Sequence, residues 1–156
     1  MKFAVASTLA AIVAASAKDF PRFDSFHANC ALQVTYQESC GSIYTLTDFY
    51  VRSWANGGPS GGLYEVFEQA DPVYIWTTRT TPVKKYVDDQ IFEYTQTSAG
   101  CVVNARSRSQ SNSVYDYSTN YCNMWNVFTA IGPFENLNHS QCAYPAEDPV
   151  ATCAVY

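Results

Sequence analysis

Charged side chains are scarce in this chain of 156 residues. They make up 15% of it, against an average of about 25% in soluble domains. The 14 acidic residues outnumber the 9 basic ones, and the formal charge of −5 disfavours nucleic acid and an anionic membrane surface as electrostatic partners. Because 47% of the residues are hydrophobic, the chain can bury a core and is not a disordered acidic segment.

The residue types of metal sites and acid–base catalysis are also few. Histidine, the commonest general base, occurs only at His27 and His139, and neither has the spacing of a zinc ligand. The sequence contains no Cys-x2-Cys pair and no Asp-x-Asp-x-Asp-Gly calcium loop. We therefore expect no metal and no cofactor. The scarcity of catalytic residue types disfavours an enzyme, and a small secreted hydrolase is left open as an alternative.

Only the first 17 residues form a long apolar run. Lys2 supplies the positive charge of a signal peptide, residues 4–15 are almost all small or apolar, and Ala17 ends a typical cleavage site. The run is shorter than the roughly 20 residues that span a bilayer. We expect residues 1–17 to be a secretory signal peptide and residues 18–156 to be a single β-rich domain, secreted and extracellular, with no membrane span.

Six cysteines follow this segment: Cys30, Cys40, Cys101, Cys122, Cys142 and Cys153. An even number of cysteines in a small secreted chain predicts disulfide bonds. Six cysteines allow fifteen connectivities, and the sequence does not choose among them. The working prediction pairs sequence neighbours: Cys30–Cys40, Cys101–Cys122 and Cys142–Cys153.

Asn138-His139-Ser140 is an N-glycosylation sequon. A glycan at Asn138 would place this stretch on the surface, because a sugar chain needs solvent around it. His139 lies inside the sequon, which makes it a poor candidate for a catalytic base.

Most of the chain has the composition of β-strands. Segments rich in Tyr, Thr, Val and Phe recur with turns between them, at residues 43–51, 63–69, 73–81, 86–95 and 101–113. This recurrence predicts an antiparallel meander. The glycine-rich residues 56–62 lack the Lys-Ser/Thr ending of a phosphate loop and predict a connection between two strands. Near the N-terminus a helix over residues 28–34 and a strand over residues 32–36 both remain open.

The periodicity changes late in the chain. Apolar residues recur there at helical spacing, at Tyr121, Met124, Trp125, Phe128 and Ile131, and Gly132-Pro133 ends the pattern. This favours a short helix over a strand. Residues 135–156 are expected to be coil held by cystines. The predicted fold is mainly β or α+β: an antiparallel meander, half-barrel or small barrel with one or two short helices, stabilised by disulfides.

Aromatic residues are abundant and make up 15% of the chain. They either fill the core or line a concave site for a ligand. Five residues in the predicted strands are the candidates for such a ligand-binding site: Tyr74, Trp76, Tyr86, Phe92 and Tyr94. The sequence therefore favours a non-enzymatic extracellular binding protein for a hydrophobic or sugar ligand. A structural or self-assembling surface protein is the alternative, because aromatic residues and low charge also favour interfaces.

In outline, a signal peptide, a β-meander, a late helix and cystines resemble the lipocalin and ependymin-like half-barrels, which bind hydrophobic ligands. The Gly-x-Trp opening of lipocalins is missing, because Ser53-Trp54-Ala55 has no glycine in the right place. The resemblance implies a half-barrel that binds a hydrophobic ligand, and no functional residue is carried over from it.

Overall fold

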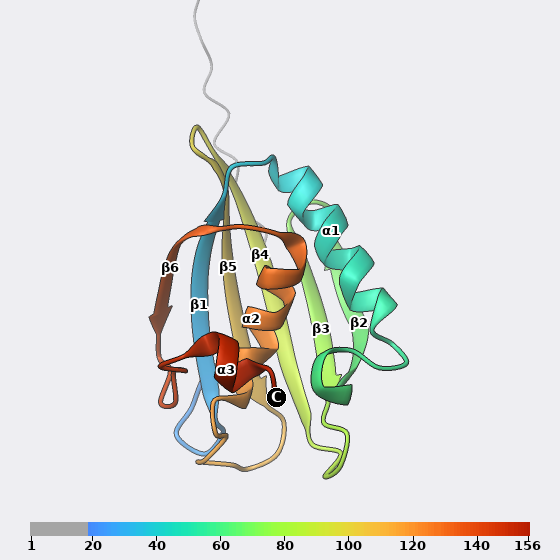
Figure 1. Cartoon of the computed structure of the whole chain (residues 1–156), viewed down its shortest axis with the longest axis vertical. Coiled ribbons are helices and arrows are strands. Elements are labelled where there is room, and N and C mark those ends of the chain that lie inside the picture. Colours follow the sequence, from blue (N-terminus) through green and yellow to red (C-terminus); the bar gives the residue numbers. More distant parts are fainter. Residues whose placement is uncertain (1–18) are drawn as a thin grey trace, which may run out of the picture.

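The computed structural model describes residues 19–156, so the predicted signal peptide lies outside the described residues. Six strands form one antiparallel sheet in the order β2-β3-β4-β5-β1-β6, and the helices lie together on one side of it (Figure 1). The elements in chain order are β1 (Asn29–Tyr36), α1 (Cys40–Ser53), a 3-10 turn (Pro59–Gly61), β2 (Leu63–Ala70), β3 (Tyr74–Thr80), β4 (Val87–Thr97), β5 (Gly100–Ser109), α2 (Thr119–Ile131), β6 (Glu135–Ser140) and α3 (Pro149–Cys153).

The predicted fold class is confirmed: the structure is a mainly antiparallel six-stranded sheet with three short helices and three disulfides. Strands β2 to β5 are the expected meander, with each strand beside the next in sequence. Strand β1 then pairs with β5, and β6 pairs with β1. The sheet has two edges, β2 and β6, and is open.

Helix α1 replaces a strand that the sequence predicted over residues 43–51, and that prediction was wrong. The Ser39 side chain caps the helix by accepting a hydrogen bond from the backbone N–H of Ser42 (3.3 Å). Ile43, Thr47 and Val51 are buried at intervals of four residues, which is the period of a helical face. Strand propensity is a weak preference, and here packing against the sheet outweighs it.

The strand alternative near the N-terminus is the correct one, because residues 29–36 form β1. The late helix is confirmed as α2, which stops at Gly132 in a positive-φ conformation (145°) that suits glycine. The C-terminal residues were expected to be coil, but they form edge strand β6 and helix α3. Asp148 caps α3 by accepting a hydrogen bond from the Ala151 N–H (3.1 Å). The glycine-rich segment connects α1 to β2 and not two strands.

All six cysteines form disulfides, but the predicted neighbour pairing was wrong. The observed bonds are Cys30–Cys142, Cys40–Cys101 and Cys122–Cys153. Strand β1 explains the first error, because an extended chain carries Cys30 and Cys40 roughly 20 Å or more apart. The bonds instead tie α1 to β5 and α2 to α3. Within residues 19–156, no helix is long and apolar enough to cross a membrane.

Candidate functional site

The helix-facing side of the sheet changes from apolar to polar along its strands. Near one end of the sheet, two neighbouring rows of side chains across β2 to β5 consist mostly of polar residues. The first row, in register, is Tyr64, Arg79, Asp88 and Ser109, and the second contains Thr77, Gln90 and Ser107. The next row is apolar, with Ile75, Phe92 and Ala105. We refer to the first two rows as the buried polar rows, because every one of their side chains named here is buried.

Asp88 is the centre of a hydrogen-bonded network at the α2 side of these rows. Its two carboxylate oxygens accept hydrogen bonds from Ser109 Oγ (2.7 Å) and from Asn123 Nδ2 (2.9 Å). Asn120 Nδ2 donates to Ser109 Oγ (3.2 Å), and Ser107 Oγ donates to the Asn120 side-chain oxygen (2.8 Å). Two asparagines of α2 therefore hold the buried carboxyl of β4. Burial raises the pKa of Asp88, although Asn123, Ser109 and Arg79 oppose the shift.

This burial predicts a specific pH dependence of stability. Because the pKa of Asp88 is raised from its ordinary 3.8, the folded chain binds its proton more tightly than the unfolded chain does. The free energy of unfolding should therefore fall as pH rises above about 4 and level off above the folded-state pKa of Asp88. Urea unfolding of wild type and Asp88→Asn across this pH range is the measurement. The free energy of unfolding of the variant should change less with pH than that of wild type. Equal pH dependence in the two proteins would contradict the assignment of this effect to Asp88.

Asp24 provides the control for this experiment, because its shift has the opposite sign. Hydrogen bonds from Arg108 and His27 lower the pKa of Asp24, so its contribution to stability is lost only as pH falls below about 4. Arg108 Nη2 donates to Asp24 Oδ2 at 2.8 Å. Asp24→Asn should change the acid limb of the stability curve and leave the limb assigned to Asp88 as it is.

Many groups in and beside the buried polar rows have no hydrogen-bond partner among residues 19–156. Seven buried side-chain atoms on β2, β3, β4 and α2 are in this state: Tyr64 Oη, Thr77 Oγ1, Arg79 Nε and Nη1, Gln90 Nε2 and Oε1, and Asn123 Oδ1. Each such group costs about 1–3 kcal/mol when it stays unpaired. Burial also raises the pKa of Tyr64 to about 12, although the nearby Arg79 opposes the shift. This concentration of unpaired groups calls for water or a ligand at this end of the sheet.

Two adjoining cavities open at the same end. The larger, which we name the tyrosine cavity, has a volume of about 370 Å³ and reaches Asp88 and Ser109. Three exposed rings surround it, those of Tyr86, Tyr115 and Tyr117, with 57–70% of each residue exposed. The side chains of Thr81, Ser111, Asn112, Ser113, Asp116 and Thr119 line the rest of it. The smaller, the arginine cavity, has a volume of about 190 Å³ and reaches Arg79.

Asp116 lines the tyrosine cavity but already has a structural role. Its carboxylate accepts hydrogen bonds from the backbone N–H of Asn120 (3.0 Å) and of Ser118 (3.3 Å), which lie at the start of α2. The Asn120 side chain also donates to it (2.8 Å). Asp116 therefore fixes the N-terminus of the helix whose asparagines hold Asp88.

The structure separates the five aromatic residues that the sequence nominated. Tyr74 and Trp76 lie on the sheet face away from the helices, where Phe20 packs edge-on against Trp76 (5.3 Å between ring centroids). Phe92 and Tyr94 lie on the opposite face in the main core. Tyr86 is exposed and lines both cavities. Four of the five are packed inside the protein, and only Tyr86 borders open space.

The two histidines and the adjacent carboxylates of β4, Asp88 and Asp89, do not assemble into a catalytic group. Asp88 and Asp89 point to opposite faces, as adjacent strand residues must, and Asp89 accepts a hydrogen bond from the Trp76 indole N–H (3.0 Å). His27 is held by Asp24 (2.8 Å). His139 is an exposed residue of β6. No group of three His, Cys, Asp or Glu residues within the described part of the chain is arranged to hold a metal ion.

Residues 58–62 have the Gly-x-Ser-x-Gly spacing of a nucleophile elbow. In hydrolases the serine of this motif stands on a sharp turn from a strand to a helix. Here Ser60 lies in the turn between helix α1 and strand β2, and its hydroxyl donates to the Ala154 carbonyl (3.2 Å). Neither histidine forms a hydrogen bond to it among the described contacts. The motif therefore lacks its structural context.

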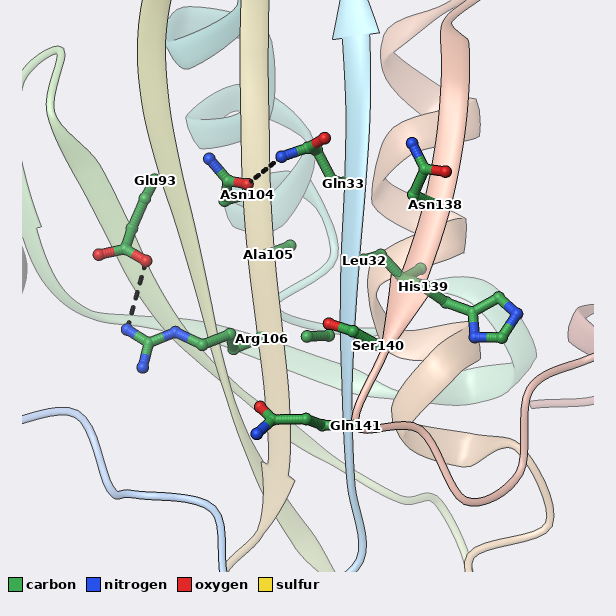
Figure 2. Close-up of a pocket in the computed structure, with 11 residues that line it drawn as sticks. Leu32, Gln33, Glu93, Asn104, Ala105, Arg106, Asn138, His139, Ser140 and Gln141 are labelled. Atoms are coloured by element: carbon green, nitrogen blue, oxygen red, sulfur yellow. Dashed lines mark hydrogen bonds and ion pairs between the residues drawn. The ribbon is translucent and has the colours of Figure 1, made fainter.

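A third hollow, of about 380 Å³, lies on the face of the sheet away from the helices, over β4, β5, β1 and β6. Four of its polar side chains form two pairs, Arg106 with Glu93 (3.2 Å) and Gln33 with Asn104 (2.7 Å), as Figure 2 shows. Asn138, the sequon residue, lies at this hollow on the exposed edge strand (Figure 2). None of the buried unpaired side-chain atoms of the described residues belongs to this hollow, so it has less need of a ligand than the buried polar rows.

Sequence reasoning missed the principal residues of the site: Arg79, Asp88, Asn120, Asn123, Tyr115 and Tyr117. One signal was present, since Ser107 and Ser109 formed a small-residue face in the alternating strand. Small side chains on a strand face leave room for groups from a packed element. In the structure, Asn120 and Asn123 of α2 occupy that room.

Comparison with known proteins informs the fold only. No protein-family model matches the chain, and no curated protein matches it in sequence. Among solved structures, the di-domain ARO/CYC StfQ from the steffimycin biosynthetic pathway is similar, with a TM-score of 0.50 at 11% identity over 69% of this chain and 50% of that one. Protein CV1439 from Chromobacterium violaceum matches with a TM-score of 0.42 at 7% identity over 67% and 95%. The match to StfQ thus spans half of that protein's length.

Proposed function

We propose that residues 18–156 are the mature form of a secreted, non-enzymatic protein that binds a saccharide in the tyrosine cavity. The signal-peptide pattern of residues 1–17 supports secretion. Three disulfides with no free cysteine in the described chain support an oxidising compartment. A glycan at Asn138, which is exposed on β6, would be consistent with the same route.

The observation that carries the proposal is the composition of the tyrosine cavity. A sugar ring presents C–H faces that pack on aromatic rings and hydroxyl groups that exchange hydrogen bonds. Tyrosine offers an apolar ring and a hydroxyl in one side chain, and Tyr86, Tyr115 and Tyr117 surround the opening. Serine, threonine and asparagine side chains, with Asp88 and Asp116, provide acceptors and donors below them. The volume of about 370 Å³ lies within the usual range for small-molecule sites.

An apolar ligand inside the sheet–helix core has less support. Ring pairs fill that space: Phe92 meets Phe128 (5.9 Å between centroids) and Tyr44 meets Tyr94 (5.6 Å). Interiors packed to this degree leave few voids larger than a water molecule. The open, polar end is therefore the better place for a ligand.

The first test is a glycan microarray probed with the labelled mature chain, followed by titration calorimetry with the glycan it retains. Tyr115→Ala and Tyr117→Ala should each weaken binding by about tenfold, because an aromatic contact contributes on the order of 0.5–1.5 kcal/mol beyond its buried area. Both residues line only the tyrosine cavity, whereas Tyr86 lines both.

Phe49→Ala is the matched control for these variants. Phe49 is an exposed aromatic residue of α1 and lines neither cavity, so its loss should leave the affinity unchanged. Absence of any retained glycan would contradict the proposal, as would equal affinity in the tyrosine variants and the control.

A further inference from the structure

Arg79 is a buried cation that forms no direct ion pair among the residues that the structure describes. Only 1% of the residue is exposed, and an arginine side chain remains charged under all ordinary conditions. Its neighbour in register, Asp88, receives its hydrogen bonds from Ser109 and Asn123. The ion pairs of the described chain join other residues. Buried charges are normally paired, so this guanidinium is suited to bind an anionic group that reaches it.

The surroundings of Arg79 hold the guanidinium in place without satisfying it. The group lies over the ring of Tyr64, with 5.9 Å between Cζ and the ring centroid. Gly62 lies on another side, where an added Cβ would overlap Arg79 Nε. A side chain at position 62 would therefore displace the guanidinium. The ring stabilises the cation, but the N–H groups of Nε and Nη1 have no acceptor within the described part of the chain.

The arginine cavity is lined by basic and hydroxyl-bearing side chains together with the apolar Pro82, Val83 and Val155. Lys84 adds a second positive charge, and Ser60, Thr81, Thr119 and Tyr86 contribute hydroxyl groups. No aspartate or glutamate side chain of the described residues lines it. Tyr156 forms part of one wall, and its carbonyl oxygen accepts a hydrogen bond from Asn126 (2.9 Å). Arginine and lysine with hydroxyl donors are the groups that bind carboxylate, sulfate and phosphate.

The two cavities share three residues, Thr81, Tyr86 and Thr119, so they adjoin. We propose that the arginine cavity is an anion subsite of the saccharide site, and that the ligand is an acidic saccharide bearing a carboxylate, sulfate or phosphate group. This inference rests on the proposed function. The sugar ring packs on the tyrosines, and its acidic substituent pairs with Arg79 and Lys84.

The test compares oligosaccharides of equal length that are neutral, uronate-containing or sulfated, with inorganic sulfate as the free-anion probe. Calorimetry on wild type should give about tenfold or more tighter binding of the acidic forms. Arg79→Met should remove that preference. Lys84→Gln should reduce the preference, whereas Lys85→Gln, a neighbouring lysine outside the cavity lining, should not.

If the Arg79→Met variant does not fold, Gly62→Ala provides a second test of the preference for acidic oligosaccharides. The added methyl group displaces the guanidinium while its charge remains, so the acidic preference should again be lost. Gly41→Ala is the matched control, because a Cβ there would contact nothing within 4 Å. Thermal unfolding of each variant establishes that it is folded before affinities are compared.

The outcomes separate the two proposals. If Tyr117→Ala weakens all oligosaccharides but Arg79→Met and Gly62→Ala leave the acidic preference intact, the anion subsite is wrong and the saccharide site stands. If sulfate alone binds and depends on Arg79, but no oligosaccharide binds, the anion site stands and the saccharide assignment is overturned. Equal wild-type affinity for neutral and acidic forms would overturn the subsite.

Discussion

Replacing Cys30 and Cys142 together with serine is expected to lower the free energy of unfolding by about 4–5 kcal/mol, the largest effect expected for this chain. This disulfide joins residues 112 positions apart, so its loss frees the longest loop of the unfolded chain. It also releases β1, a central strand, from the segment that follows β6. The measurement is urea unfolding of the wild type and of the double serine variant, both without reductant.

The Cys122/Cys153 double serine variant is the comparison, because its bond spans only 31 positions. Chain entropy alone then predicts a loss of roughly 3–4 kcal/mol. If the shorter crosslink proved to be the more important one, restriction of the unfolded chain would not be the main source of stability. The packing of α3 on α2 would then be the better explanation.

Phe128→Ala is expected to destabilise the fold by about 3–5 kcal/mol. Phe128 is fully buried and lies between Phe92 of β4 and Phe134, with ring centroids 5.9 and 6.0 Å away. Its backbone carbonyl also accepts the hydrogen bond of the buried Tyr36 hydroxyl (2.9 Å). Truncation would leave a cavity at the contact between α2 and the sheet, which the close packing of a protein interior cannot fill without strain.

Chemical denaturation monitored by circular dichroism measures this loss. Phe49→Ala, on the exposed surface of α1 with 61% of the residue exposed, should change stability by no more than about 0.5 kcal/mol. A loss below about 1 kcal/mol for Phe128→Ala would mean that the helix–sheet contact is not a well-packed core.

The elements with a strong local signal were the predictable ones. Strand β5 alternates clearly, the other strands of the meander are rich in strand-forming residues and separated by turns, and α2 has both an apolar stripe and a Gly-Pro stop. The prediction for the segment that forms α1 was wrong because its Tyr, Thr and Val residues suit a strand. Ile43, Thr47 and Val51 also recur at a helical period. In this segment the local preference of the residues favoured a strand, whereas packing against the sheet favoured a helix, and packing was the stronger effect.

The candidate site was far less predictable. Arg79, Asp88 and Ser109 lie on three different strands and are joined only by strand register. Asn120 and Asn123 reach them from a helix whose apolar stripe gave no indication of a polar contact. The aromatic set chosen from the sequence contained one residue of the site, Tyr86, because ring content does not distinguish a core residue from a cavity residue.

Composition and local pattern were sufficient for the class of the fold, the meander and the presence of cystines, because each depends on residue type or on short-range periodicity. The cystine pairs, the polar end of the helix–sheet interface and the unpaired Arg79 were decided by tertiary structure. Each depends on which distant segments face one another. That choice follows from long-range packing and register, which no short window of sequence contains.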